Sequence, residues 1–387
     1  MRRREFIQNT LGGMAMLATA KISGLAFAEG VSTPVSAQTP PATDNSVASK
    51  FSKLRGVNLG AWLVLEKWMT PDTFRGTSVE DEYTLCQVLG DKAQNRLDRH
   101  RDTFITARDF RWIKDSGLNA VRLPVGYWAL EAPAPYVECS RYIDFALDQC
   151  QKNNLKLLLD LHGAPGSQNG WDHSGRAGAI NWPKDPQNIQ ETLRVLESFA
   201  QKYGNHPALC GIELLNEPRP EVPLDILQKF YQDGYTRVRK YLSPDVAVVI
   251  HDSFRPLEWK SFMQQPEFNN VILDTHLYQC FDHDAKTRSG LQQLAFALNR
   301  KTALDEMQSE ELPPMVGEWS LSLPHKAMSG LSSLQMESVT RGYAGAQLLN
   351  YEATRGWFFW SYKLEQPSEW HFRHCVERGW LPSNFAV

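Results

Sequence analysis

The sequence predicts an α/β protein, a (β/α)8 TIM barrel that forms a single domain. Short runs rich in Val, Ile and Leu recur between longer stretches with helical periodicity, a pattern typical of parallel β/α units. Eight such runs lie in about 337 of the 387 residues, a length within the usual range of this barrel. An open doubly wound sheet is the main alternative, but no GxGxxG motif follows an early strand.

The strands and the helices between them follow the chain in order. The predicted strands are residues 57–59, 120–123, 155–161, 211–215, 246–250, 271–274, 314–317 and 357–360. Helical patterns include residues 109–114, 142–153 and 188–202. We expect the insert at 61–105 to form helices and loops over one rim, and residues 321–345 to form a helix or loop. Residues 364–387 should form a final loop and a terminal segment packed on the barrel.

The first 50 residues are expected to lie outside the fold. Arg3 and Arg4, followed by Phe-Ile, resemble a twin-arginine export signal, and an apolar run at 11–20 precedes Ala-Phe-Ala at 26–28. We therefore predict a signal peptide at 1–28, a linker rich in Pro, Ser, Thr and Ala at 29–50, and a catalytic domain at 51–387. The protein would be periplasmic or secreted, with no membrane span after signal cleavage.

Charge and composition exclude several classes of protein. The net charge is −3, with 41 basic and 44 acidic residues. This balance lacks the excess of positive charge expected of a nucleic-acid-binding protein or of a polybasic membrane-binding surface. The six cysteines form no CxxC pair and no Cys/His group with zinc spacing, and no disulfide pairing is predicted. The 12 Trp, 12 Tyr and 18 Phe fit either a large core or sugar-stacking surfaces, and composition alone favours the core.

Polar or aromatic residues end seven of the eight apolar runs. They include Arg122, Asp160, His162, Asn216, Glu217, His251, Asp252, Asp274, His276, Tyr278, Glu318 and Trp360. A folding core gains nothing from such residues, because burying charge is costly unless it is paired. The carboxyl ends of the strands are where such barrels place their active sites, so this pattern predicts a site.

Two carboxylates among these residues suggest a reaction. Glu217 follows the fourth predicted strand and Glu318 the seventh, so their side chains could face each other across the barrel mouth. A close pair of carboxyl groups suits retaining glycoside hydrolysis, in which one acts as acid/base and the other as nucleophile. We interpret the other acids, Glu213, Asp160, Asp252 and Asp274, as mainly orienting or structural.

These motifs carry a family resemblance. Residues 214–218 (LLNEP) and 316–320 (VGEWS) resemble the acid/base and nucleophile motifs of glycoside hydrolase family 5. An ordered series of further motifs resembles the fungal exo-β-1,3-glucanase group within it. These motifs are residues 55–60, 62–66, 81–83, 121–128, 160–170, 276–281 and 357–363. The resemblance covers nearly all of 51–387.

The resemblance implies roles for the reacting carboxylates and their neighbours. Glu217 would be the acid/base and Glu318 the nucleophile. Asn216 would hydrogen-bond the sugar 2-hydroxyl, an interaction that strengthens in the transition state. Arg122 and Tyr278 would hold Glu318 ionised and oriented.

The resemblance also implies a sugar pocket. His162 and His276 would bind hydroxyls or the two glutamates in the first sugar subsite, Glu66 would grip a hydroxyl at the non-reducing end, and Trp360 would be the stacking floor. Trp171 and Phe281 would form an aromatic pair at the entrance. The stretch 321–345 is shorter than in the fungal enzymes, and Cys280 is interpreted as a packing residue.

The resemblance implies a retaining β-glycoside hydrolase for β-glucan, a glucan exo-1,3-β-glucosidase acting by double displacement without metal or cofactor, and we expect a monomer. Alternatives on the same fold are an endo-β-1,4-glucanase and a β-1,3-glucanosyltransferase. A metal-dependent barrel hydrolase could use His162, His251 and His276, but it would normally place His-x-His on an early strand, where residues 57–59 read Val-Asn-Leu. A barrel that only binds a ligand is the last alternative.

Overall fold

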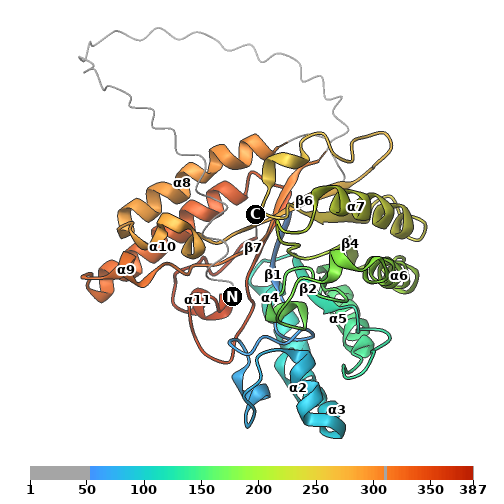
Figure 1. Cartoon of the computed structure of the whole chain (residues 1–387). Coiled ribbons are helices and arrows are strands. Elements are labelled where there is room, and N and C mark those ends of the chain that lie inside the picture. Colours follow the sequence, from blue (N-terminus) through green and yellow to red (C-terminus); the bar gives the residue numbers. More distant parts are fainter. Residues whose placement is uncertain (1–52, 309–311, 387) are drawn as a thin grey trace, which may run out of the picture.

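The computed structural model describes residues 53–308 and 312–386, and in this part of the chain eight parallel strands close into a barrel in sequential order (Figure 1). The strands are β1 Leu54–Asn58, β2 Ala120–Gly126, β3 Lys156–Gly163, β4 Leu209–Glu213, β5 Ala247–His251, β6 Val271–Leu277, β7 Pro314–Trp319 and β8 Gly356–Phe359. Each of the eight predicted strands overlaps its counterpart, and β1 pairs with both β2 and β8 to close the ring. The predicted fold class is confirmed.

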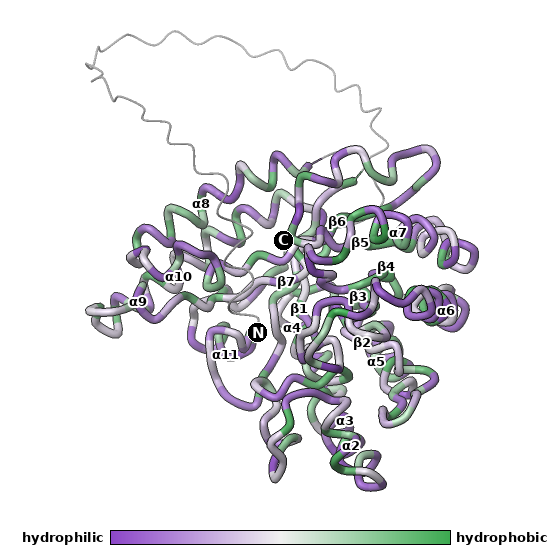
Figure 2. The backbone as a smooth tube through the Cα atoms, in the orientation of Figure 1, coloured by the Kyte–Doolittle hydropathy of each residue, from purple (hydrophilic) through white to green (hydrophobic). Residues whose placement is uncertain are grey.

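Helices form the outer layer of the barrel (Figure 1). The α-helices are α2 Glu82–Leu89, α3 Ala93–Phe104, α4 Ala107–Asp115, α5 Ser140–Lys152, α6 Pro186–Tyr203, α7 Leu224–Arg239, α8 Gly290–Met307, α9 His325–Met328, α10 Ser333–Tyr351 and α11 Phe372–Glu377. Short 3-10 helices are η1 Pro71–Phe74, η2 Gly90–Lys92, η3 Asp172–Ser174, η4 Trp182–Lys184, η5 Pro256–Trp259, η6 Gln279–Phe281 and η7 His283–Lys286. Hydrophobic and hydrophilic positions alternate along the outer helices, as expected where one face packs on the barrel (Figure 2).

Local sequence signals explain where several helices begin. Capping boxes start α4 at Thr106, α8 at Ser289 and α10 at Ser332, each with its partner three residues later. In α6, the Asp185 carboxylate accepts from the backbone of Gln187, and proline occupies the first helical position. The predicted helices at 109–114, 142–153 and 188–202 correspond to α4, α5 and α6.

The strand period of two residues builds the barrel interior in layers. The lower part of the interior is apolar and consists of Ala120, Leu158, Ala247, Val249, Ile272, Met315 and Phe358. Side chains two residues further along a strand share the same face. The layer above therefore contains Asn58, Arg122, Asp160, Glu213, His251, Asp274 and Trp360, all with at most 1% of their surface exposed. The apolar layer supports a buried polar layer at the carboxyl ends of the strands.

The predicted insert after the first strand contains η1, α2, η2 and α3, which lie together at one side of the barrel (Figure 1). A fully buried ion pair anchors it, since Arg101 Nη2 lies 3.1 Å from Glu82 Oε1 and neither side chain is exposed. The same carboxylate accepts from the indole of Trp128 at 3.2 Å and from the backbone of Leu65 at 2.9 Å. The insert is thereby fixed to the rim of the barrel.

The C-terminal segment also packs on the barrel, as predicted. It contains α11, and the backbone of Phe385 donates to the carbonyl of Ser116 at 2.8 Å. All six cysteines are free thiols. Across 53–308 and 312–386, no helix combines the length and apolar character that a bilayer crossing requires. The predicted signal peptide and linker lie outside the described residues.

Candidate active site

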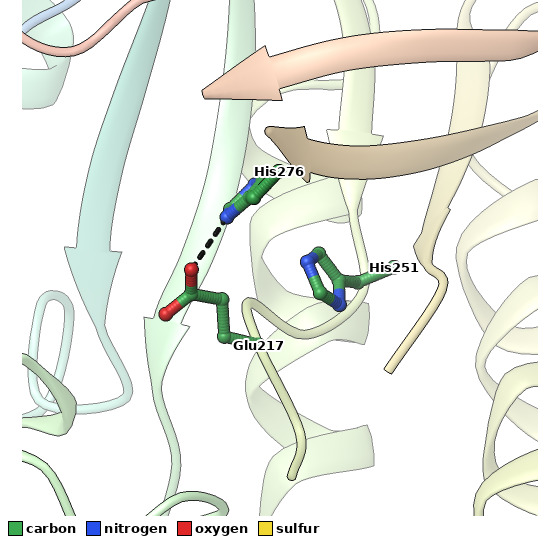
Figure 3. A group of neighbouring side chains, drawn as sticks. All are labelled: Glu217, His251 and His276. Atoms are coloured by element: carbon green, nitrogen blue, oxygen red, sulfur yellow. Dashed lines mark hydrogen bonds and ion pairs between the residues drawn. The ribbon is translucent and has the colours of Figure 1, made fainter. Parts of the chain in front are cut away.

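Glu217 and Glu318 meet at one imidazole nitrogen. His276 Nδ1 lies 2.7 Å from Glu217 Oε1, as Figure 3 shows, and 3.5 Å from Glu318 Oε2. These two carboxylate oxygens therefore lie no more than about 6.2 Å apart, the sum of the two distances. Retaining glycosidases separate their carboxyl groups by about 5–5.5 Å and inverting enzymes by roughly 6.5–9.5 Å. The upper limit of about 6.2 Å for the distance between these two oxygens is shorter than the separation found in inverting enzymes.

The backbone brings the two glutamates to this point in different ways. Glu318 lies within β7, whereas Glu217 follows the end of β4 with φ 44°. A residue other than glycine in the left-handed region stores about 1–3 kcal/mol of strain, a cost often found at functional sites. Both side chains are at most 1% exposed.

Two donors contact the carboxylate of Glu318. Arg122 Nη1 donates to Oε1 at 3.2 Å, and the Tyr278 hydroxyl donates to Oε2 at 2.7 Å. Charge-assisted hydrogen bonds of this kind are stronger than neutral ones. They fix the orientation of the side chain and favour a negative charge on it.

Arg122 is the hub of the buried polar layer. Its Nε donates to Glu213 Oε2 at 2.8 Å, its Nη2 donates to Asn216 Oδ1 at 2.8 Å, and Nη2 lies 3.1 Å from Asp160 Oδ2. Burial alone would lower the pKa of Arg122, but the carboxylates of Asp160, Glu213 and Glu318 raise it well above its usual value. Burial raises the pKa of Asp160 to about 8, although Arg122 opposes that shift. The acids below the two glutamates thus orient the guanidinium.

His276 is held between acids. Besides Glu217 and Glu318, it contacts Asp274 Oδ2 through Nε2 at 3.3 Å. Burial lowers its pKa, but Glu318 and Asp274 outweigh burial and raise the pKa well above the usual value. A β-carbon on Gly317 would lie 1.9 Å from Asp274 Oδ2, and the Gly317 N–H donates to Asp274 Oδ1 at 2.6 Å. The glycine before Glu318 is therefore required for Asp274 to reach the imidazole.

Two further histidines lie near Glu217. His251 Nδ1 accepts from the backbone N–H of Ser253 at 2.9 Å, so its Nε2 holds the proton, and its ring lies edge-on to His276 at 4.4 Å (Figure 3). Burial, followed by the neighbouring His276, lowers the pKa of His251 well below its usual value, so the ring is neutral. His173 Nε2 lies 3.4 Å from Glu217 Oε2.

Trp360, the expected pocket floor, lies against His162. Their rings stack with centroids 5.5 Å apart and planes 10° apart. Burial lowers the pKa of His162 to about 3, so it donates through Nδ1 to Asp160 Oδ2 at 2.6 Å and accepts through Nε2 from the Asn216 amide at 3.4 Å. This network fixes the orientation of the Asn216 side chain.

Glu66 lies under an aromatic wall at the rim. Its Oε2 accepts from the indole N–H of Trp68 at 2.7 Å, and the Trp68 ring meets Trp370 edge-on at 5.5 Å. Trp370 in turn lies 5.1 Å from the ring of Tyr278 and 5.9 Å from that of Phe281. We call Trp68 and Trp370 the rim wall. Trp68 is 45% exposed while Glu66 is 2% exposed, so the wall separates the carboxylate from solvent.

The predicted entrance pair lies on two sides of the site. Trp171 is 3% exposed, and its ring contacts His173 at 5.3 Å and Phe254 at 6.2 Å. Arg219 lies over the same indole at 5.4 Å. Phe281 instead packs beside Tyr278 and the rim wall, with its ring 5.7 Å from that of Tyr278.

Four contributors were missed by the sequence reasoning: Trp68, His173, Phe254 and Trp370. Trp68, His173 and Trp370 lie about ten residues beyond the end of a strand, so the rule that located the other residues could not identify them. Phe254 follows β5 by three residues and could have been found by the same rule.

The geometry also bears on metal binding. In the described residues, ligand atoms of Glu217, His251 and His276 lie within 4.8 Å of one another, as do those of Glu213, Asp274 and His276. Both groups use His276, whose two ring nitrogens already contact Glu217 and Asp274.

Comparisons with known proteins agree with this geometry. A family profile described as "Cellulase (glycosyl hydrolase family 5)" matches residues 91–365. A "Glucan 1,3-beta-glucosidase" of Blumeria graminis is 39% identical over 389 residues, covering 88% of this chain and 90% of that protein. A protein of the same description from Candida oleophila is 37% identical, covering 85% and 88%. A crystal structure of rutinosidase from Aspergillus niger matches with TM-score 0.72 and 22% identity over 85% of this chain and 97% of that one, which shows a shared fold.

Proposed function

The chain belongs to glycosyl hydrolase family 5 and is an O-glycosyl hydrolase, and from this premise we propose that it is a glucan 1,3-β-glucosidase that releases glucose from chain ends with retention of configuration. The observation that supports the retaining reaction best is the contact of Glu217 and Glu318 with the same nitrogen of His276. The names of the curated relatives supply the proposed substrate, β-1,3-glucan.

In the first step, a Glu318 oxygen attacks the anomeric carbon while the glycosidic C–O bond breaks. Glu217 gives its proton to the departing oxygen, and a covalent glycosyl-enzyme forms. In the second step, Glu217 takes a proton from water, the water oxygen attacks the anomeric carbon, and Glu318 leaves as a carboxylate. Arg122 and Tyr278 both donate hydrogen bonds to Glu318. They support the assignment of Glu318 as the nucleophile, because they stabilise its negative oxygen before attack and after departure.

The surrounding residues would hold the reacting sugar. We propose that the Asn216 amide binds the 2-hydroxyl, that Trp360 stacks under the ring, and that His162, whose two ring nitrogens bond to Asp160 and Asn216, holds the amide in place. The stacking of His162 on Trp360 and the bond from Asn216 to His162 support one rigid subsite. Rigid placement removes the orientational cost of reaching the transition state.

Burial supports removal of the terminal sugar. Glu66, Trp360, Glu217 and Glu318 are each at most 2% exposed, as expected at the bottom of a narrow pocket and not along an open groove. We propose that the rim wall, Trp68 and Trp370, blocks the chain beyond the terminal glucose, with Glu66 binding its hydroxyl. Trp171 and Phe281, on opposite sides, would contact the next glucose.

We also propose that the protein is exported from the cytoplasm by the twin-arginine route. The twin-arginine motif and the Ala-Phe-Ala sequence at 26–28 support cleavage after residue 28, a linker at 29–50 and a monomeric catalytic domain at 51–387 in the periplasm or outside the cell. Size determination of the exported protein, with Arg3→Lys/Arg4→Lys as the export-blocked control, tests this.

The products formed from laminarin over time distinguish the remaining alternatives, with Glu318→Gln as the inactive control. Glucose as the sole product from the earliest time supports the proposed function. Early mixed oligosaccharides would indicate an endo-acting glucanase, and longer products at high substrate would indicate a glucanosyltransferase. Activity lost with a chelator and restored by a divalent cation would favour the metal-dependent alternative.

A further inference from the structure

A cavity of about 660 Å³ lies outside the active site. It is formed by η1, α3 and the segment after β8, and we call it the basic cleft. Its charged lining consists of Arg75, Arg96, Arg99, Lys363, Asp72 and Glu365. The volume lies within the range of about 300–1,000 Å³ that small-molecule sites occupy.

Positive charge exceeds negative charge in the basic cleft, with four cationic side chains against two carboxylates. Arg75 pairs with Asp72, and Lys363 Nζ lies 3.2 Å from the carboxylate of Asp109 on α4. In the described part of the chain, no ion pair joins Arg96 or Arg99 to a carboxylate. These two arginines are three residues apart on α3, so they face the same side of the helix and repel each other.

One of the two guanidiniums is already held in place. Arg96 Nη1 donates to the carbonyl oxygens of Thr73 at 3.1 Å and Arg75 at 3.2 Å, which fixes the group while leaving other N–H donors for a ligand. His100, which directly follows Arg99 on α3, adds no charge at neutral pH, because burial lowers its pKa to about 4. The cationic character therefore comes from arginine and lysine, which stay charged over the physiological range.

The cleft also offers an apolar surface. The half-buried ring of Phe104 belongs to its lining, with Lys363 Nζ 5.3 Å from the ring centroid. Leu364 lines the cleft and also packs in the apolar cluster that contains Trp360 and Tyr278 of the active site. Leu364 therefore links the lining of the cleft to the residues around the two glutamates.

From these features we propose that the basic cleft binds an anionic glycan, an oligosaccharide whose sugars carry carboxylate groups. Arginine binds carboxylates with paired hydrogen bonds, and the half-buried edge of Phe104, whose ring already stacks on His100, can contact the apolar face of a sugar, which inorganic anions lack. The site would tether the enzyme to acidic polysaccharide beside its neutral glucan substrate.

The test measures binding of hexagalacturonate to the purified protein by calorimetry at low and moderate salt. Laminarihexaose serves as the neutral probe and is measured with the inactive Glu318→Gln variant, so that it is not hydrolysed. Inorganic phosphate serves as the small-anion probe. The cleft variant is Arg96→Gln/Arg99→Gln. Its matched control is Arg108→Gln/Arg111→Gln on α4, an exposed pair with the same spacing and the same change of charge that lies outside the cleft.

We expect hexagalacturonate to bind more tightly than phosphate, and the cleft variant to weaken binding at least about tenfold while the control pair changes it less than about twofold. Arg99→Gln alone, which removes no internal contact, should already weaken binding in a folded protein. Absence of hexagalacturonate binding, equal losses in both double variants, or phosphate binding as tight as the glycan would each overturn the proposal. Laminarin hydrolysis should be unchanged in both double variants, so failure here leaves the glucanase proposal intact.

Discussion

Replacing Tyr278 with phenylalanine tests the proposed support of the nucleophile. The change removes the hydroxyl that donates to Glu318 Oε2 at 2.7 Å and leaves the ring that packs against Trp370 and Phe281. The fold should therefore be retained, and the loss should fall on the reaction.

The size of the effect follows from the contact. A hydrogen bond to a charged group contributes about 1.5–3 kcal/mol, which corresponds to roughly a 10- to 150-fold decrease in kcat/KM if the bond is fully used in the transition state. The decrease should appear in kcat/KM for an aryl β-glucoside with a good leaving group, because Glu318 attacks in that step.

Tyr351→Phe is the matched control. Its hydroxyl is buried and donates to Gln347 Oε1 at 3.1 Å within α10, away from the two glutamates. It should cost about 1 kcal/mol of stability and leave kcat/KM unchanged. If Tyr278→Phe keeps kcat/KM within about twofold of wild type, Tyr278 does not support the nucleophile and the reasoning is refuted.

Three other changes test separate parts of the structure. Gly317→Ala should lower the unfolding free energy by about 2 kcal/mol or more and abolish activity, because its β-carbon would collide with Asp274, whereas an unchanged melting temperature would contradict the close approach. Burial lowers the pKa of His100 from 6.5 to about 4, so the stability present above pH 6.5 is lost as pH falls toward 4. His100→Gln should make the melting temperature vary less with pH across this window, and an unchanged dependence on pH would disprove this origin. Trp68→Ala should raise the KM for laminari-oligosaccharides about tenfold by removing the N–H on Glu66, and an unchanged KM would place the rim wall away from the terminal sugar.

The sequence predicted the barrel and its buried polar layer for a physical reason. Strand period and strand-end chemistry are local signals, so Arg122, Glu318 and His276 could be placed at the barrel mouth from short motifs. The left-handed backbone at Glu217 and the close approach of Gly317 to Asp274 could not be predicted from these motifs, because a residue before proline normally favours extended backbone and the second contact joins two strands.

The rim was harder to predict. Trp68, His173 and Trp370 reach the site only through the paths of long loops, which depend on packing between segments distant in the sequence. Trp68 reads as an ordinary aromatic until its indole is seen to donate to Glu66. The basic cleft is likewise not evident in the sequence, because Arg96 and Arg99 resemble any solvated helix face until the segment after β8 is seen to line the same cavity.

The central claim is that Glu318 is the nucleophile of a retaining reaction. The most direct measurement is mass spectrometry of the protein after reaction with an activated 2-deoxy-2-fluoro-β-glucoside, which slows release of a glycosyl-enzyme, followed by mapping of the labelled peptide. The account predicts one label per chain on Glu318, present in Tyr278→Phe at a slower rate and absent in Glu318→Gln. A label on another residue, or an inverted first product without any label, would contradict it.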